Sequence, residues 1–237
     1  MSAFCVCSSL LTDEALRTLK KRFHVILLPP DNALPPPIRC HPDSIFAVVG
    51  DDLIVPAAYY DTYPDVVDEI ASRGQFRLIL SDAPRGSVYP ADTGLNAAVG
   101  RDFVICRPKS AAPELLQAAE RNGFDIIPVR QGYGGCACLV TEGGVLTGDP
   151  GIAKALEARG IPHQLLSPEG IRLPGYDCGF IGGACGYHDG VIYIGGDPSR
   201  LPCYPLLRRF AMEHDYSILP LAAGDMTDVG GIRIFSR

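Results

Sequence analysis

Residues 44–81, SIFAVVGDDLIVPAAYYDTYPDVVDEIASRGQFRLILS, contain one complete pattern of secondary structure. Two short apolar runs flank the glycine and aspartates at 50–52, residue types that favour a tight hairpin turn. The next segment, 62–74, has apolar residues at helical spacing, and the leucine-rich run after it is too short for a helix. This stretch therefore predicts strand, turn, strand, helix and strand in that order.

The same order of elements recurs along the chain. Apolar residues at helical spacing predict helices at 12–22, 62–74, 112–123, 150–160 and 204–214. A short β-branched or leucine-rich run follows each one and predicts strands that begin near residues 24, 76, 125, 163 and 217. We expect three of the helices to end at glycines in the left-handed conformation: Gly74, Gly123 and Gly160. Repetition on this scale indicates a fold built from similar modules.

Pairs of apolar runs joined by a turn also precede the later helices, at 94–108, 138–150 and 180–198. The last is rich in glycine, but it contains no G-x-G-x-x-G and no glycine followed by lysine and serine, so a phosphate-binding loop is excluded. The spacing C-x6-C-x2-H in this region, formed by Cys178, Cys185 and His188, matches no common zinc site. We interpret 173–196 as two strands and their turn, with buried thiols and a turn histidine.

The fifth module is divided between the two ends of the chain. Residues 225–237 supply one strand, and residues 2–29 supply another strand, the helix and the last strand. Pairing the two ends would close a ring and protect the sheet edges at the join. The proline-rich segment 30–40 is expected to be a linker. The sequence thus predicts one α/β domain over 1–237, with five strand-strand-helix-strand modules around a pseudo-fivefold axis.

Composition and charge exclude several classes of partner. The formal net charge is −6 and no run of lysine or arginine is longer than three residues, so we expect no binding to nucleic acid or to an anionic membrane. No apolar run reaches the roughly eighteen residues that span a bilayer, and the first residues lack the features of a signal peptide. The nine cysteines favour free thiols in a reducing compartment. We expect a cytoplasmic protein, and the oligomeric state stays open.

Five short motifs occur in order along the chain: HPD at 41–43, DTGLNAAVG at 92–100, QGYGGCACLVT at 131–141, LPGYDCGFIGG at 173–183 and DVGG at 228–231. In this order they resemble a bacterial domain family of unknown function assigned to the pentein fold, also called the guanidino-group-modifying-enzyme fold. The resemblance extends over essentially the whole chain. It implies a β/α propeller of five modules, with the last module shared by the two termini.

The resemblance also implies where a nucleophile would stand. Enzymes of this fold, such as arginine deiminases and dimethylarginine hydrolases, use a cysteine in the last module, because attack on a guanidinium carbon needs a thiolate. Dimethylarginine hydrolases place it three residues beyond a Gly-Gly pair, but here Gly230-Gly231 is followed at that offset by Ile234. We therefore expect a non-hydrolytic protein that binds a small molecule or a partner, and whether the chain is an enzyme stays open.

The alternative is a thiol-dependent hydrolase or transferase that acts on a guanidino or amine-bearing metabolite. Cys136 is then the first candidate for the nucleophile and His41 for the acid or base, while Asp43 or Asp228 orients the substrate.

Residues that open the first strand of each module are expected to meet near the axis, because pseudo-symmetric repeats place equivalent positions around it. The predicted ligand-binding residues are Asp43, Asn96, Tyr133, Tyr176 and Asp228. Such a pocket is polar and mildly acidic, and it suits a small polar or cationic metabolite. Some of these residues also have a purely structural interpretation. His41 and Asp43 could simply shape a turn around Pro42, and Tyr133 and Tyr176 could serve packing.

No cofactor and no metal ion is expected. Three thiols at equivalent module positions, Cys40, Cys136 and Cys178, could still bind zinc or a soft metal together with His41. Repeats reuse residue types for packing as well as for ligation, so we favour unrelated buried thiols.

Overall fold

The module predicted for residues 44–81 is present in the computed structural model, which describes residues 3–236. Strand β3 (Ala47–Val49) pairs antiparallel with β4 (Asp52–Pro56) across a turn at Gly50, and β4 pairs parallel with β5 (Arg77–Ser81). Helix α4 (Pro64–Gly74) makes the connection, preceded by α3 (Ala57–Thr62), which the apolar pattern did not predict.

Three further modules repeat this topology, with an antiparallel hairpin and a third strand parallel to the second. One contains β6 (Ala98–Val99), β7 (Phe103–Cys106), α5 (Pro113–Arg121) and β8 (Asp125–Pro128). The next contains β9 (Cys138–Thr141), β10 (Gly144–Thr147), α7 (Pro150–Glu157) and β11 (His163–Leu165). The third contains β12 (Cys185–His188), β13 (Val191–Ile194), a 3-10 turn (Pro198–Arg200), α8 (Tyr204–Glu213) and β14 (Ser217–Pro220).

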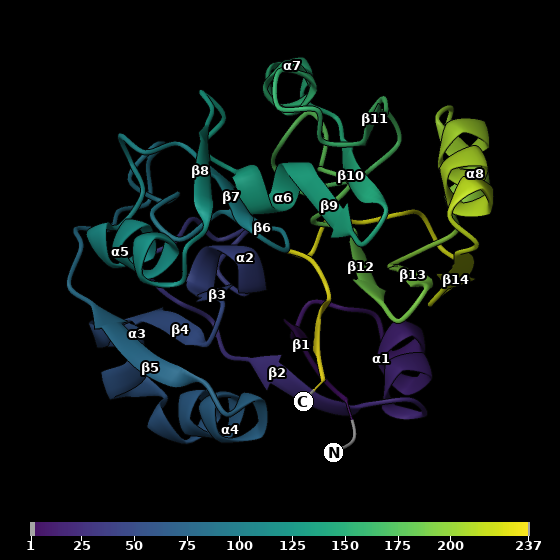
Figure 1. The fold of residues 1–237 in the computed structure, drawn as a ribbon. Coiled ribbons are helices and arrows are strands. Elements are labelled where there is room, and N and C mark those ends of the chain that lie inside the picture. Colours follow the sequence, from purple (N-terminus) through teal and green to yellow (C-terminus); the bar gives the residue numbers. More distant parts are fainter. Residues whose placement is uncertain (1–2, 237) are drawn as a thin grey trace.

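The remaining module joins the two ends of the chain, as predicted. Strand β1 (Phe4–Ser8) pairs antiparallel with β15 (Arg233–Phe235) on one side and parallel with β2 (His24–Leu28) on the other, and α1 (Asp13–Lys20) connects β1 to β2. The two ends lie side by side in Figure 1. The five three-stranded sheets therefore surround one axis, with the long helices at the periphery (Figure 1).

Helix ends follow local capping chemistry, with one correction. Gly123 and Gly160 adopt the predicted left-handed conformation after α5 and α7, with φ of +72° and +66°. After α4, however, Gln75 has φ +50° and Gly74 stays helical. A Cβ at position 74 would overlap the ring of Phe76. Glycine is needed there for the space it leaves, and not for its backbone freedom.

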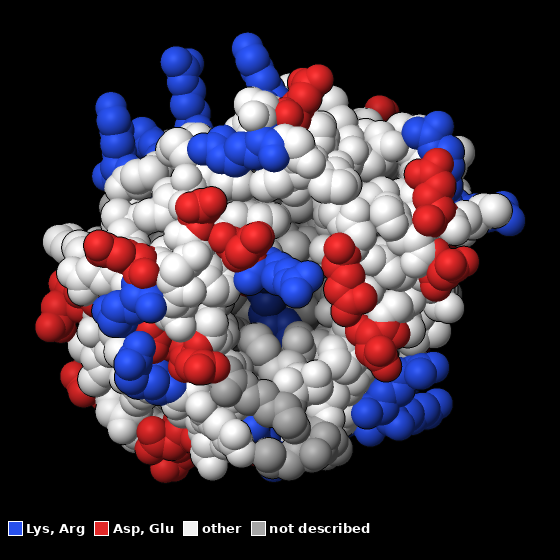
Figure 2. Space-filling view, in the orientation of Figure 1, with Lys and Arg blue, Asp and Glu red and all other residues white. Residues whose placement is uncertain are grey.

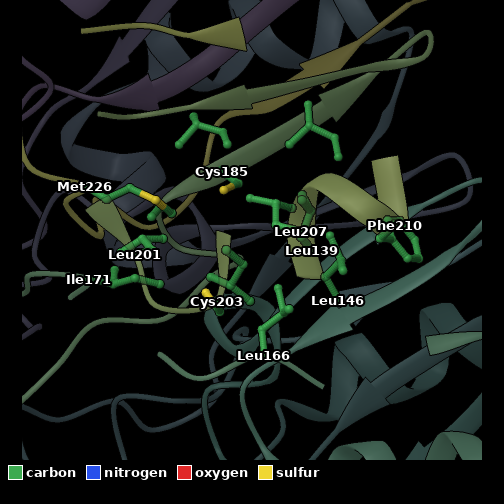
Figure 3. Close-up of a cluster of buried hydrophobic side chains, with 14 of the residues drawn as sticks. Leu139, Leu146, Leu166, Ile171, Cys185, Leu201, Cys203, Leu207, Phe210 and Met226 are labelled. Carbon is green, nitrogen blue, oxygen red and sulfur yellow. The ribbon is translucent and has the colours of Figure 1, made fainter. Parts of the chain in front are cut away.

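Hydrophobic side chains form clusters shared by neighbouring modules. Figure 3 shows one of them, in which Leu139 and Leu146 from β9 and β10 lie near Leu207 and Phe210 from α8. Burying a leucine side chain is worth about 1.5–3 kcal/mol, so each shared cluster fixes one module against the next. The ring is consequently held by packing between modules and by the strand pairing of β1 with β15.

The hairpin predicted for 173–196 is shorter than expected. Its strands begin only at Cys185, and residues 173–184 form a loop. That loop meets the C-terminal segment, because Arg172 bridges Thr227 and the backbone N–H of Asp228 donates to the carbonyl of Arg172. None of the described helices has the length and apolar character needed to cross a membrane.

Candidate functional site

Five polar or thiol side chains meet where the innermost strands begin. His41 and Asp43 belong to the turn formed by α2 (Pro42–Ile45), and Cys136 lies in α6 (Gly134–Ala137). Asn96 precedes β6 and Asp228 precedes β15. All five are almost completely buried, with exposures of 1–4%. We call His41, Asp43, Asn96, Cys136 and Asp228 the axial cluster.

Asn96 connects the parts of this cluster. Its amide nitrogen donates to Asp43 Oδ1 at 3.1 Å and to Ser44 Oγ at 2.9 Å. Its amide oxygen accepts from the backbone N–H groups of Gly135 and Cys136 at 2.8 and 3.2 Å. A buried amide must find such partners, which explains the polar residue in the apolar run LNAAV. Asn96 therefore holds α2 and α6 in one arrangement. Ser44 was missed by the sequence prediction, although it directly follows Asp43.

Cys136 is held as a neutral thiol. Its Sγ lies 2.7 Å from Asp43 Oδ2 and donates to that carboxylate. Burial raises the pKa of the Cys136 thiol well above its usual value, and the charges of Asp43 and Asp228 raise it further. A thiol in this state is a poor nucleophile, because reactivity belongs to the thiolate.

Asp228 has a carboxylate oriented by backbone donors. The N–H of Phe180 donates to Oδ2 at 2.9 Å and the N–H of Gly230 to Oδ1 at 3.0 Å. Burial raises the pKa of Asp228 to about 7, the charge of Asp43 raises it too, and the two backbone hydrogen bonds act in the opposite direction. Gly183 leaves the space for this carboxylate, since a Cβ at that position would overlap Asp228 Oδ1.

His41 has unused hydrogen-bonding capacity. Its Nδ1 lies 3.7 Å from Asp228 Oδ1, beyond a normal hydrogen bond, and neither ring nitrogen has a hydrogen-bond partner among the described residues. Burial lowers the pKa of the imidazole, and the charge of Asp43 partly opposes the shift. The ring is therefore neutral and offers a free lone pair. Gly230, with φ +80°, is required beside it, because a Cβ there would overlap the histidine side chain.

Two predicted ligand-binding residues lie outside the axial cluster. The hydroxyl of Tyr133 donates to Asp92 Oδ2 at 2.6 Å, and its ring packs against Tyr89 and Phe180. Tyr176 is 43% exposed. Burial raises the pKa of both tyrosine hydroxyls, and the charge of Asp92 raises it further.

The three thiols considered for a metal site do not meet. Within the described part of the chain, the one group of three or more His, Cys, Asp or Glu side chains close enough to share an ion is His41, Cys136 and Asp228. Cys40 is buried elsewhere and Cys178 is partly exposed. Of the three cysteines, only Cys136 belongs to the axial cluster.

A cavity of about 380 Å³ extends along the innermost strands. All five modules contribute to its wall, which includes Phe46, Ala97, Cys138, Gly182 and Ile234. Figure 2 shows one face of the molecule hollowed near its centre, with atoms of lysine or arginine inside the hollow. Arg233 is the only lysine or arginine among the described residues that line the cavity. Its backbone pairs with Val6 of β1, but no hydrogen bond or ion pair joins its side chain to the rest of the described chain.

Solved structures of similar fold come from enzymes of guanidino metabolism. A dimethylarginine dimethylaminohydrolase in an adduct with S-methyl-L-thiocitrulline has a TM-score of 0.59 at 12% identity, covering 99% of this chain and 100% of that one. The enzyme from Pseudomonas aeruginosa complexed with citrulline has a TM-score of 0.57 at 11% identity, covering 98% and 96%. An arginine dihydrolase of the cyanobacterial ornithine-ammonia cycle has a TM-score of 0.53 at 12% identity, covering 95% of this chain and 38% of that one.

At these identities the likeness shows the fold alone, and it confirms the five-module pentein architecture expected from the repeats. Among curated proteins, none matches this chain in sequence. Residues 6–233 match the family described as "Family of unknown function (DUF6873)". The match includes every residue of the axial cluster, and the chain belongs to this family of unknown function with the pentein fold.

Proposed function

We propose that this chain binds a small cation, either an inorganic ion or the cationic group of a metabolite, in the axial cluster, and that it does so without a catalytic cysteine in its C-terminal module. One observation carries the proposal. The carboxylates of Asp43 and Asp228 and the thiol of Cys136 converge, yet no lysine or arginine of the described residues lies within ion-pairing distance of either carboxylate.

Two other buried carboxylates of the same protein are paired with arginine, whereas a third, Asp92, accepts only from the hydroxyl of Tyr133. Asp52, with 0% exposure, accepts from Arg77 at 2.6 Å and from Arg121 at 3.0 Å. Asp31 pairs with Arg85. Burying a carboxylate without a cation is costly and favours its protonated form, as the raised pKa of Asp228 reflects. A cationic ligand would supply the partner that the two carboxylates of the axial cluster lack.

The enzymes of similar fold suggest which organic cations could bind. Two are dimethylarginine dimethylaminohydrolases, in structures with S-methyl-L-thiocitrulline or citrulline, and the third is an arginine dihydrolase. Guanidinium and ammonium groups are the cations that a pair of carboxylates can orient by hydrogen bonds. This supports a guanidino or amine-bearing metabolite as the organic ligand class.

The second candidate function is thiol-dependent hydrolysis or transfer at the same residues. It is favoured by the approach of His41, Cys136 and Asp228 to within 4.8 Å of one another. The raised pKa of Cys136 opposes it, since a cation would first have to bind and stabilise the thiolate. Binding without turnover requires no such ionisation of the thiol, and we therefore favour it.

Calorimetric titration with arginine, agmatine and methylarginine, together with assays for ammonia, amine and ureido product, tests both candidates. We expect binding without product, and a loss of affinity of about 10-fold or more in Asp43→Asn and Asp228→Asn, since each removes one buried charge. Asp61→Asn, at an exposed position, is the matched control. Product formation that disappears in Cys136→Ser would replace the first candidate by the second.

A further inference from the structure

We propose that the cation is a divalent d-block metal ion of the zinc class, bound by His41, Cys136 and Asp228. This inference rests on the proposed function, because it names the cation of the same site. It replaces the expectation from sequence that no metal is bound.

The spacing of the three side chains suits one ion. One ligand atom from each residue lies within 4.8 Å of the other two, and His41 Nδ1 is already 3.7 Å from Asp228 Oδ1. In a tetrahedral zinc site with bonds of about 2.0–2.3 Å, neighbouring ligand atoms stand roughly 3.3–3.8 Å apart. The ligand atoms would therefore have to approach one another by about 1 Å at most.

The donor set selects the class of metal. Thiolate and imidazole are ligands that zinc, cobalt, nickel and iron prefer, while calcium and magnesium take oxygen ligands almost exclusively. A thiol is also a weak hydrogen-bond acceptor for an organic ammonium group. The combination of Cys136, His41 and Asp228 thus favours a transition ion over both hard cations and amines.

His41 gives independent support. The side chain is 1% exposed and neither ring nitrogen has a partner among the described residues, which is an uncommon state for a buried polar group. A metal ion would accept a lone pair from one of these nitrogens. No other described side chain offers this histidine a hydrogen bond, so its place in the cluster is explained by a ligand that is not part of the chain.

The surrounding contacts would orient the ligands. Asp228 is fixed by the backbone N–H groups of Phe180 and Gly230, and Cys136 by Asp43, which is itself held by Asn96 and Ser44. Such outer contacts are typical of metal sites, where they set ligand geometry. On binding, the Sγ–H bond of Cys136 breaks, the sulfur keeps the electron pair for the metal, and the proton leaves to Asp43 or to water. Three protein ligands leave a fourth position for water or for a small molecule.

The test uses the full chain, stripped of metal and titrated with Co²⁺ and then Zn²⁺. We expect one equivalent of Co²⁺ per chain, with a thiolate-to-cobalt charge-transfer absorption, and displacement by Zn²⁺. Cys136→Ser should abolish the charge-transfer absorption, and Asp228→Asn and His41→Gln should weaken binding by about 10-fold to 100-fold. Cys138→Ser and Cys178→Ser are matched controls that leave the spectrum unchanged, because neither thiol belongs to the cluster.

X-ray absorption of the zinc-loaded unsubstituted chain keeps the test decisive where a variant fails to fold. One sulfur and two or three nitrogen or oxygen neighbours are expected. A shell without sulfur, or a charge-transfer band that persists in Cys136→Ser, overturns the metal site. If guanidino or amine ligands bind while Co²⁺ and Zn²⁺ do not, this inference fails and the proposed function stands. If no cation of either kind binds, both fail.

Discussion

Cys136 and Asp43 are separated by 93 residues in the sequence, yet Cys136 Sγ lies 2.7 Å from Asp43 Oδ2. The two side chains come from the short helices before β3 and β9, and the amide of Asn96 lies between them with hydrogen bonds to both helices. The contact places a thiol against a carboxylate at the axis of the ring. Its stability depends on a third residue that belongs to another module.

Removing the amide of Asn96 is expected to destabilise the fold. Asn96→Ala leaves the N–H groups of Gly135 and Cys136 and the oxygen of Ser44 without this partner, and each unsatisfied buried group costs about 1–3 kcal/mol. We expect the free energy of unfolding in urea to fall by roughly 3 kcal/mol. Ser44→Ala, which removes fewer bonds, should cost about 1 kcal/mol. Equal losses in the two variants would contradict the central position of Asn96.

Thiol labelling should distinguish Cys136 from Cys178. Cys136 is buried and its pKa is raised, whereas Cys178 is partly exposed. With a disulfide reagent at neutral pH we expect the fast phase to vanish in Cys178→Ser and to remain in Cys136→Ser. Rapid modification of Cys136 near pH 6, located by peptide mass analysis, would instead support the thiol-dependent enzyme.

The metal-free protein should lose stability as the pH rises towards neutrality. The pKa of Asp228 is about 7 in the folded chain and close to the ordinary value of about 3.9 when unfolded, so the folded state binds the proton more tightly. This contribution is fully present below about pH 4 and is lost as the pH rises through 7, with a total on the order of a few kcal/mol.

Asp228→Asn mimics the protonated carboxyl and should remove this part of the pH dependence. Denaturant unfolding between pH 4 and 8 is the measurement, and at pH 8 the variant should be at least as stable as the unsubstituted chain. Asp61→Asn should keep the original slope, since that carboxylate is exposed. An unchanged slope in Asp228→Asn would show that this group does not titrate in the range.

Gly183→Ala should disturb the axial cluster while leaving the modules intact. The new Cβ would overlap Asp228 Oδ1 and push the carboxylate away from His41. We expect cation affinity to fall by at least about 10-fold, because ligand positions matter within a few tenths of an ångström. Gly224→Ala is the control, since a Cβ there meets no atom within 4 Å. Unchanged affinity in Gly183→Ala would argue that Asp228 does not bind the cation.

Arg233 should contribute little to stability, unlike Arg85. The side chain of Arg233 lines the cavity along the innermost strands without a hydrogen-bond or ion-pair partner among the described residues, whereas Arg85 pairs with Asp31 and donates to the carbonyl of Ser44 at 2.8 Å. Arg233→Met is expected to change the free energy of unfolding by less than about 1 kcal/mol, and Arg85→Met to lower it by about 3 kcal/mol, because it leaves a largely buried carboxylate unpaired. Thermal or urea unfolding of both variants checks the contrast.

The sequence by itself determined the modules. Helical periodicity, β-branched runs and turn residues are local signals, and they predicted the five helices, the hairpins and the division of one module between β1 and β15. Because a ring of repeats brings the starts of the inner strands together, it also indicated that Asp43, Asn96, Cys136 and Asp228 would lie near one another.

Only the tertiary structure decided which atoms meet. The sequence contained no local signal that Asn96 bonds both short helices, that Cys40 and Cys178 stay outside the cluster, or that Gly183 makes room for Asp228. These contacts join segments far apart in the chain, and their geometry depends on loops whose lengths differ between modules. Periodicity fixes the face on which a side chain lies, but convergence to within a few ångströms requires the packed ring.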